Sequence, residues 1–189
     1  MVNGILIVDK PQDFTSHDVV AKLRGMLRQK KIGHAGTLDP MATGVLVVLL
    51  GSATRASDYA SSARKCYRAR LKLGITTDTQ DITGTVLEQK PVTVTEQQLQ
   101  DTLRAFTGDL RQLPPMYSAV QKDGVRLYDL ARKGIDVERE ARPITVHRLE
   151  LENTLIGVDL VYNYELVASD IYGSQILELI GDKPAKLVV

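Results

Sequence analysis

The sequence is poor in the residues that build disulfides and metal sites. Cys66 is the single cysteine among 189 residues, which excludes an intrachain disulfide and disfavours a cysteine-based metal site. The three histidines, His17, His34 and His147, are scattered, and no pair has the spacing of metal ligands on a helix. We therefore expect no bound metal.

Long apolar runs and targeting signals are also missing. No hydrophobic stretch approaches the roughly 20 residues that cross a bilayer, and the start, MVNGILIVDKPQ, has no basic segment ahead of its apolar one. GHAGTLDP lacks the spacing of a phosphate-binding loop, and GSATR lacks that of a nucleophile elbow. These absences predict a cytoplasmic protein with no membrane partner.

What the chain does contain is a folded-protein composition with an uneven charge. Hydrophobic residues make up 43% and charged residues 25%, which suits one domain of ordinary size. The net charge of +1 conceals a division: residues 1–72 carry 12 Lys and Arg against 5 Asp and Glu, whereas residues 73–189 carry 12 against 18. A basic first third favours contact with a polyanion such as nucleic acid, with ordinary solvated charge as the alternative.

Hydrophobic periodicity predicts helices interspersed among clustered strands, which is typical of an α+β protein. A helix is expected over 15–29, where Thr15 and Asp18 form a capping box, and another over 95–108, ended by Gly108. The expected strands cover residues 4–9, 44–50, 65–74, 143–152 and 158–169.

Asp39 stands in the densest part of the sequence, between Leu38 and Pro40. Gly33 and Gly36 precede it and allow a close backbone approach, and an apolar run follows. An Asp before a Pro is a common turn former. A carboxylate at the mouth of a pocket can instead act as a nucleophile or general base. The spacing alone leaves both interpretations open.

Four segments, which follow one another along the chain, help to choose between the two interpretations of Asp39. The run GHAGTLDPMATGVLVVLLGSATR resembles the signature HxGTLDPxAxGVLxxxxGxATK/R of the TruB family of tRNA pseudouridine synthases. The upstream NGILIVDKPQDFTSHDVV is similar to the start of that family. KCYRARLKLGITTDTQDITGTV and FTGDLRQLPPMYSAVQKDG are similar to its later segments. The resemblance runs from residue 3 to about residue 151, in the family order.

The resemblance implies a fold, a reaction and a partner. The fold would be a pseudouridine synthase α+β core, with a mixed, largely antiparallel sheet flanked by helices. The reaction would convert a uridine in the T loop of tRNA, at position 55, to pseudouridine without metal or cofactor. Asp39 would be the catalytic residue, attacking the base or acting on the sugar. We expect the chain to be a monomer that binds the tRNA T stem-loop.

The same resemblance assigns further residues to the substrate. Tyr67 would stack on the target base, His34 would contact the flipped nucleotide, and Lys10 would lie near the active site. Read without the family, these three are a core aromatic, a polar loop residue and a solvated strand end. The candidate RNA phosphate contacts are Lys22, Arg24, Arg28, Lys30, Lys31, Arg64 and Lys65.

The chain departs from the family beyond about residue 151. The family run V-x-C-S-K-G-T-Y-I-R-x-L carries a second active-site tyrosine and the arginine that pairs with the catalytic aspartate. Here the sequence reads YELVASDIYGSQILELIGDKPAKLVV, and no arginine follows Arg148. Tyr172 is the candidate for the second tyrosine, with a boundary aromatic as the alternative.

These departures leave several functions open. We expect one catalytic domain over 1–189, with 152–189 atypical and the family's PUA-type C-terminal domain absent. The alternative function is a catalytically impaired member that binds RNA and keeps the fold. A relative that modifies other RNAs through a guide complex is a third possibility.

Overall fold

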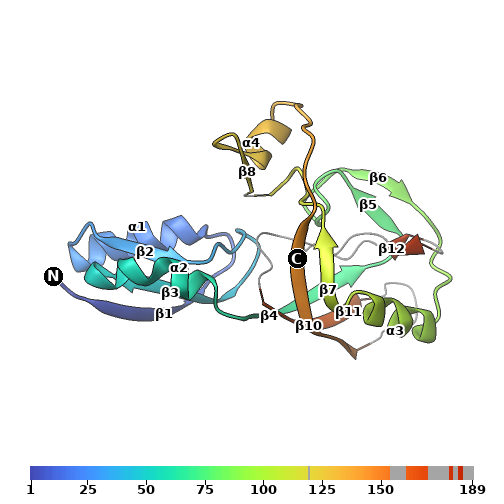
Figure 1. Cartoon of the computed structure of the whole chain (residues 1–189), viewed down its shortest axis with the longest axis horizontal. Coiled ribbons are helices and arrows are strands. Elements are labelled where there is room, and N and C mark those ends of the chain that lie inside the picture. The colour runs from blue at the N-terminus through green and yellow to red at the C-terminus, as the bar shows by residue number, and fades with distance from the viewer. Residues whose placement is uncertain (119, 154–160, 170–178, 181–182, 185–189) are drawn as a thin grey trace. The chain divides into compact units, whose positions relative to one another are not determined.

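The computed structural model describes residues 1–118, 120–153, 161–169, 179–180 and 183–184. It divides into two units, residues 1–63 and residues 64–189, which are described separately (Figure 1). Each unit buries its own apolar core.

The first unit is a three-stranded antiparallel sheet with a helix packed on it. The strand order is β1 (Gly4–Lys10), β3 (Gly44–Leu50), β2 (Ile32–Ala35), so the central strand is the apolar run that follows Asp39. α1 (Ser16–Leu27) connects β1 to β2, and its Val20 is buried together with Leu46 and Val48 of β3 (Figure 1). After β3 come a 3-10 turn η1 (Gly51–Ala56) and the short helix α2 (Ser57–Ser61).

The predicted capping box opens α1. The Thr15 hydroxyl oxygen accepts from the Asp18 amide at 3.0 Å, and the Asp18 carboxylate accepts from the Thr15 amide at 2.8 Å. The helix ends sooner than predicted, because Arg28 adopts a left-handed conformation with φ of 51°. Met26, which has the spacing of the apolar positions, stays exposed.

We expect Thr15→Ala to lower the free energy of unfolding by about 1 kcal/mol, since the cap satisfies an otherwise unpaired helix amide. Hydrogen bonds from the Thr15 side chain and backbone hold the pKa of Asp18 below its ordinary value of 3.8. That stabilisation is therefore present above the ordinary pKa and is lost as pH falls through the lowered one. Urea unfolding at neutral and acidic pH measures both effects. The control is Thr93→Ala, at an exposed threonine outside any helix; equal stability of the two variants contradicts the prediction.

The second unit is built on a four-stranded antiparallel sheet. The order is β4 (Lys65–Lys72), β11 (Val161–Ser169), β10 (Arg142–Asn153), β7 (Gly108–Gln112). β4 alternates as predicted, with Leu71 buried and Arg68 exposed. Smaller elements complete the unit: β5 (Ile75–Thr77), β6 (Val86–Gln89), β8 (Gln121–Lys122), β9 (Val125–Arg126), α4 (Leu127–Ala131), β12 (Leu179–Ile180) and β13 (Lys183–Pro184).

Helix α3 (Glu96–Ala105) covers the core of this unit. Its predicted inward residues Leu99 and Leu103 are buried with Val146 of β10. The prediction that Gly108 ends the helix is wrong. The helix ends at Ala105, and Gly108 begins β7 with φ of +101°.

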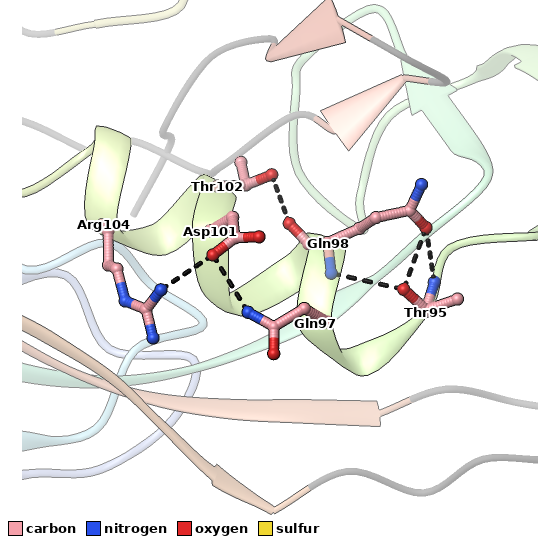
Figure 2. A network of polar contacts seen from close by, with 6 residues as sticks. All are labelled: Thr95, Gln97, Gln98, Asp101, Thr102 and Arg104. Carbon is pink, nitrogen blue, oxygen red and sulfur yellow. Dashed lines mark hydrogen bonds and ion pairs between the residues drawn. The ribbon is translucent and has the colours of Figure 1, made fainter.

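Polar contacts along the outer surface of α3 extend from its N-cap, Thr95, to Arg104 in its last turn (Figure 2). The Gln98 side-chain oxygen accepts from the Thr95 amide at 2.8 Å, which completes a capping box at the N-terminus. Asp101 accepts from Gln97 at 3.0 Å and from Arg104 at 2.8 Å, both at helical spacing. The helix is thus stabilised locally as well as by its buried face.

These elements confirm the predicted α+β class. All strand pairs in the described part of the chain are antiparallel. No described helix is long and apolar enough to cross a membrane.

Candidate active site

Asp39 lies half-buried in the loop between β2 and β3. Its backbone carbonyl accepts from the Ala42 amide at 3.0 Å, with Pro40 at the second position, which is the arrangement of a β-turn. The backbone carbonyl of Asp39 thus closes the turn. A residue in a turn can also be a catalytic residue, so the catalytic role of Asp39 stays a prediction.

Ser16 fixes the residue before Asp39. Its hydroxyl oxygen accepts from the Leu38 amide at 2.9 Å and donates to the Leu38 carbonyl at 3.2 Å. Ser16 is the first residue of α1 and is only 2% exposed. This contact is not predictable from the spacing of the residues, although the capping residue Thr15 locates the start of the helix.

Lys10 fixes the residue after Asp39. Its side chain is fully buried, and Nζ donates to the carbonyls of Pro11 at 2.9 Å, Phe14 at 2.5 Å and Pro40 at 3.2 Å. The Asp13 amide donates to the same Pro40 carbonyl at 2.7 Å. An ammonium group has three N–H donors, and three acceptors surround it here. The interpretation of Lys10 as a solvated strand end is wrong, because three carbonyls replace water.

His34 lies on β2, directly upstream of the Asp39 loop. Its Nδ1 is 2.7 Å from the carbonyl oxygen of Gly36, and since a carbonyl only accepts, Nδ1 carries the hydrogen. Gly36 has φ of +104°, a conformation that favours glycine. The expected need for glycine at position 33 is not found, because a Cβ there meets Thr54 at an ordinary 4.0 Å.

Five of the predicted phosphate contacts lie in the first unit and form an exposed group. It consists of residues of α1, its C-cap and the loop after it: Lys22, Arg24, Arg28, Lys30 and Lys31. Arg24 also donates to the Ile32 carbonyl at 2.8 Å, which ties the helix to β2. Arg64 and Lys65 belong to the second unit. The charge of this group is thus available to a ligand on the same unit that carries Asp39.

The remaining predicted site residues lie elsewhere. Tyr67 is on β4 of the second unit, where it is partly buried against the core that contains Leu71 and Leu73. Its interpretation as a core aromatic is confirmed, and its stacking role stays a prediction. Tyr172 lies outside the described residues. Within the described part, no three His, Cys, Asp or Glu side chains are grouped so as to hold a metal ion.

Comparison with known proteins decides the family. The family model for the N-terminal domain of the TruB family pseudouridylate synthases matches residues 24–159. The chain belongs to the TruB family. A tRNA pseudouridine synthase B of Moorella thermoacetica is 54% identical over 152 residues, which cover 80% of this chain and 50% of the relative. A tRNA pseudouridine synthase B of Opitutus terrae is 53% identical over 151 residues, which cover 79% of this chain and 63% of the relative.

Two solved structures agree with the fold. A crystal structure of a Cbf5–Nop10–Gar1 complex matches with a TM-score of 0.61 and 27% identity, over 89% of this chain and 40% of that chain. The structure of an H/ACA ribonucleoprotein bound to a substrate RNA containing 2′-deoxyuridine matches with a TM-score of 0.57 and 25% identity. The match covers 89% of this chain and 39% of that chain. This TruB-family chain spans about half the length of most of the curated relatives it matches.

Proposed function

We propose that this chain converts a uridine in the T loop of tRNA to pseudouridine, with Asp39 as the catalytic residue. The observation that carries the proposal is the fixed position of the Asp39 loop. Leu38 is held by Ser16, and Pro40 is held by Lys10 and Asp13. A catalytic group held in this way loses little entropy on reaching its reactive geometry. Relatives named tRNA pseudouridine synthase B, about half identical to the chain, support the same reaction.

The reaction is an isomerisation, so its atoms balance without a second substrate. The bond between the sugar C1′ and the uracil N1 breaks, the base rotates, and C1′ joins C5. C5 then loses its hydrogen, and N1 gains one. The Asp39 carboxylate would either attack the base or take a proton from the sugar, and both routes need its ionised form.

The target base is stacked inside a folded RNA and has to be flipped out before Asp39 can reach it. We expect His34 to contact the flipped nucleotide, because it is close to Asp39 in the chain and its ring is anchored through Nδ1. Tyr67 is the proposed stacking residue, and Tyr172 is the proposed second tyrosine of the active site. The comparisons give no support to a non-catalytic RNA-binding member, since the relatives are named as synthases.

The test is direct. The full chain is incubated with a T stem-loop RNA, and pseudouridine is detected by mass spectrometry after nuclease digestion. The expected result is one pseudouridine per RNA at the loop uridine. If the RNA binds and no pseudouridine forms, the catalytic proposal fails and the RNA-binding alternative takes its place.

We expect the affinity for T stem-loop RNA to fall steeply as salt rises, because lysine and arginine contacts to phosphates release counterions. Each contact contributes about 0.7–0.9 to the slope of log affinity against log salt. Lys30→Gln and Lys31→Gln together are expected to flatten the slope by about 1.5. Lys133→Gln, at an exposed lysine of the second unit, is the matched control. A slope near zero for the wild-type chain contradicts the phosphate contacts.

A further inference from the structure

A pocket that the proposed reaction does not use lies in the second unit. It has a volume of about 190 Å³ and is lined by residues of two loops and by Arg139: Asp78, Gln80, Pro115, Met116 and Tyr117. Pockets for drug-sized ligands are larger, roughly 300–1,000 Å³. The volume of this pocket is therefore sufficient for a small group such as one ring system.

The turn between β5 and β6 is held rigidly at this pocket. Asp78 Oδ1 accepts from the amides of Thr79 and Thr85, both at 2.8 Å. Asp81 Oδ1 accepts from the Thr79 hydroxyl at 2.8 Å and the Thr83 hydroxyl at 2.6 Å. These side-chain hydrogen bonds hold the turn in one conformation and so fix the position of the residue at its centre.

The residue presented is Gln80. It adopts φ of 63°, a left-handed conformation that is unfavourable for a side chain of this kind. Gly84 allows the turn to close, since a Cβ at that position would meet Thr79 Oγ1 at only 2.2 Å. Strained residues of this type concentrate at ligand sites, where surrounding contacts hold them in place.

Two residues that line the pocket have buried polar atoms with unmet hydrogen bonds. In the part of the chain that the structure describes, neither Gln80 Oε1 nor Arg139 Nε has a partner, although both atoms are buried. Arg139 is held at its far end, where Nη1 donates to the Pro114 carbonyl at 3.1 Å. Buried polar atoms are nearly always paired in folded proteins. The two unpaired atoms are therefore candidate partners for a ligand in the pocket, which Gln80 and Arg139 help to line.

We propose that this pocket binds an unpaired guanine base. The Watson–Crick edge of guanine has two donors, N1–H and the 2-amino group, beside one acceptor, O6. Asp78 and Gln80 supply two acceptors, and Arg139 supplies one donor. Tyr117 and Met116 offer the aromatic and apolar surface on which a flipped base stacks. Adenine reverses this pattern of donors and acceptors.

The inference rests on the proposed function, because the guanine is assigned to the bound RNA. The pocket would provide a second contact to that RNA, and this contact would distinguish guanine from other bases. The first probe is independent of catalysis: the full chain is titrated by calorimetry with guanosine, inosine and adenosine monophosphates. Inosine lacks only the 2-amino group. We expect it to bind about fivefold more weakly, and adenosine monophosphate to bind more weakly still.

Variants connect this preference to the pocket. Gln80→Met removes the acceptor and is expected to weaken guanosine monophosphate binding about fivefold. Asp78→Asn keeps the Oδ1 acceptor for Thr79 and Thr85 but places an N–H donor beside it. This variant is also expected to bind guanosine monophosphate about fivefold more weakly. Gln97→Met, at an exposed position on α3, is expected to bind like the wild type. Equal affinity for the three nucleotides, or wild-type binding by both pocket variants, overturns the proposal.

The second probe identifies the source of the base. A stem-loop RNA with one loop guanosine is compared with the same RNA carrying inosine, and the inosine RNA is expected to bind more weakly. Equal affinity for the two RNAs overturns the assignment of the base to RNA. Pseudouridine formation is measured in parallel on a stem-loop without loop guanosine. Activity there shows that a failed guanine test leaves the proposed reaction standing.

Discussion

Asp39→Asn is expected to reduce the rate of pseudouridine formation by at least about a thousandfold. Asparagine has nearly the same shape but cannot serve as an anionic nucleophile or base. The β-turn is expected to persist, because it uses the backbone carbonyl of Asp39 and the Ala42 amide. The affinity for T stem-loop RNA is expected to stay within about threefold, since one negative charge is removed and no phosphate contact is lost. Single-turnover kinetics and a binding titration measure the two quantities.

The matched control is Asp58→Asn, an exposed acid in the first turn of α2. It makes the same chemical change in the same unit and is expected to keep wild-type activity. Thermal unfolding of both variants checks that the fold is intact. If Asp39→Asn retains a tenth or more of the wild-type rate, Asp39 is a turn residue and not the catalytic group.

Lys10→Met is expected to lower the free energy of unfolding by about 2–4 kcal/mol. The substitution keeps an unbranched apolar side chain but removes all three donors. The carbonyls of Pro11 and Phe14 lose this partner, while Pro40 keeps the Asp13 amide. The Asp39 loop loses one of its anchors at the same time. We therefore expect kcat to fall more than the affinity for RNA.

Urea unfolding and steady-state kinetics of Lys10→Met test this expectation, with Lys133→Met as the control at an exposed lysine. A loss of RNA affinity with unchanged kcat and unchanged stability points to a direct substrate contact instead. That outcome contradicts the positioning role and supports the interpretation drawn from the family resemblance.

The long elements were predictable because their patterns are local. β1, α1, β3 and β4 follow from apolar residues repeating at the spacing of a strand or a helix. Short elements such as β2 and α2 were missed, since four or five residues are too few to show a period. Gly108 was misassigned because glycine with positive φ serves equally at a helix end and at the start of a strand.

The sequence by itself determined the family and the candidate catalytic residue. The stretch around Asp39 is contiguous, and its residues keep their order and spacing however the chain folds. Only the tertiary structure decided what holds Asp39 in place. Lys10 reaches Pro40 across 30 positions, and Ser16 reaches Leu38 across 22. A lysine is buried only where folding gathers enough carbonyls to replace water around its charge, and no pattern of neighbouring residues reports that.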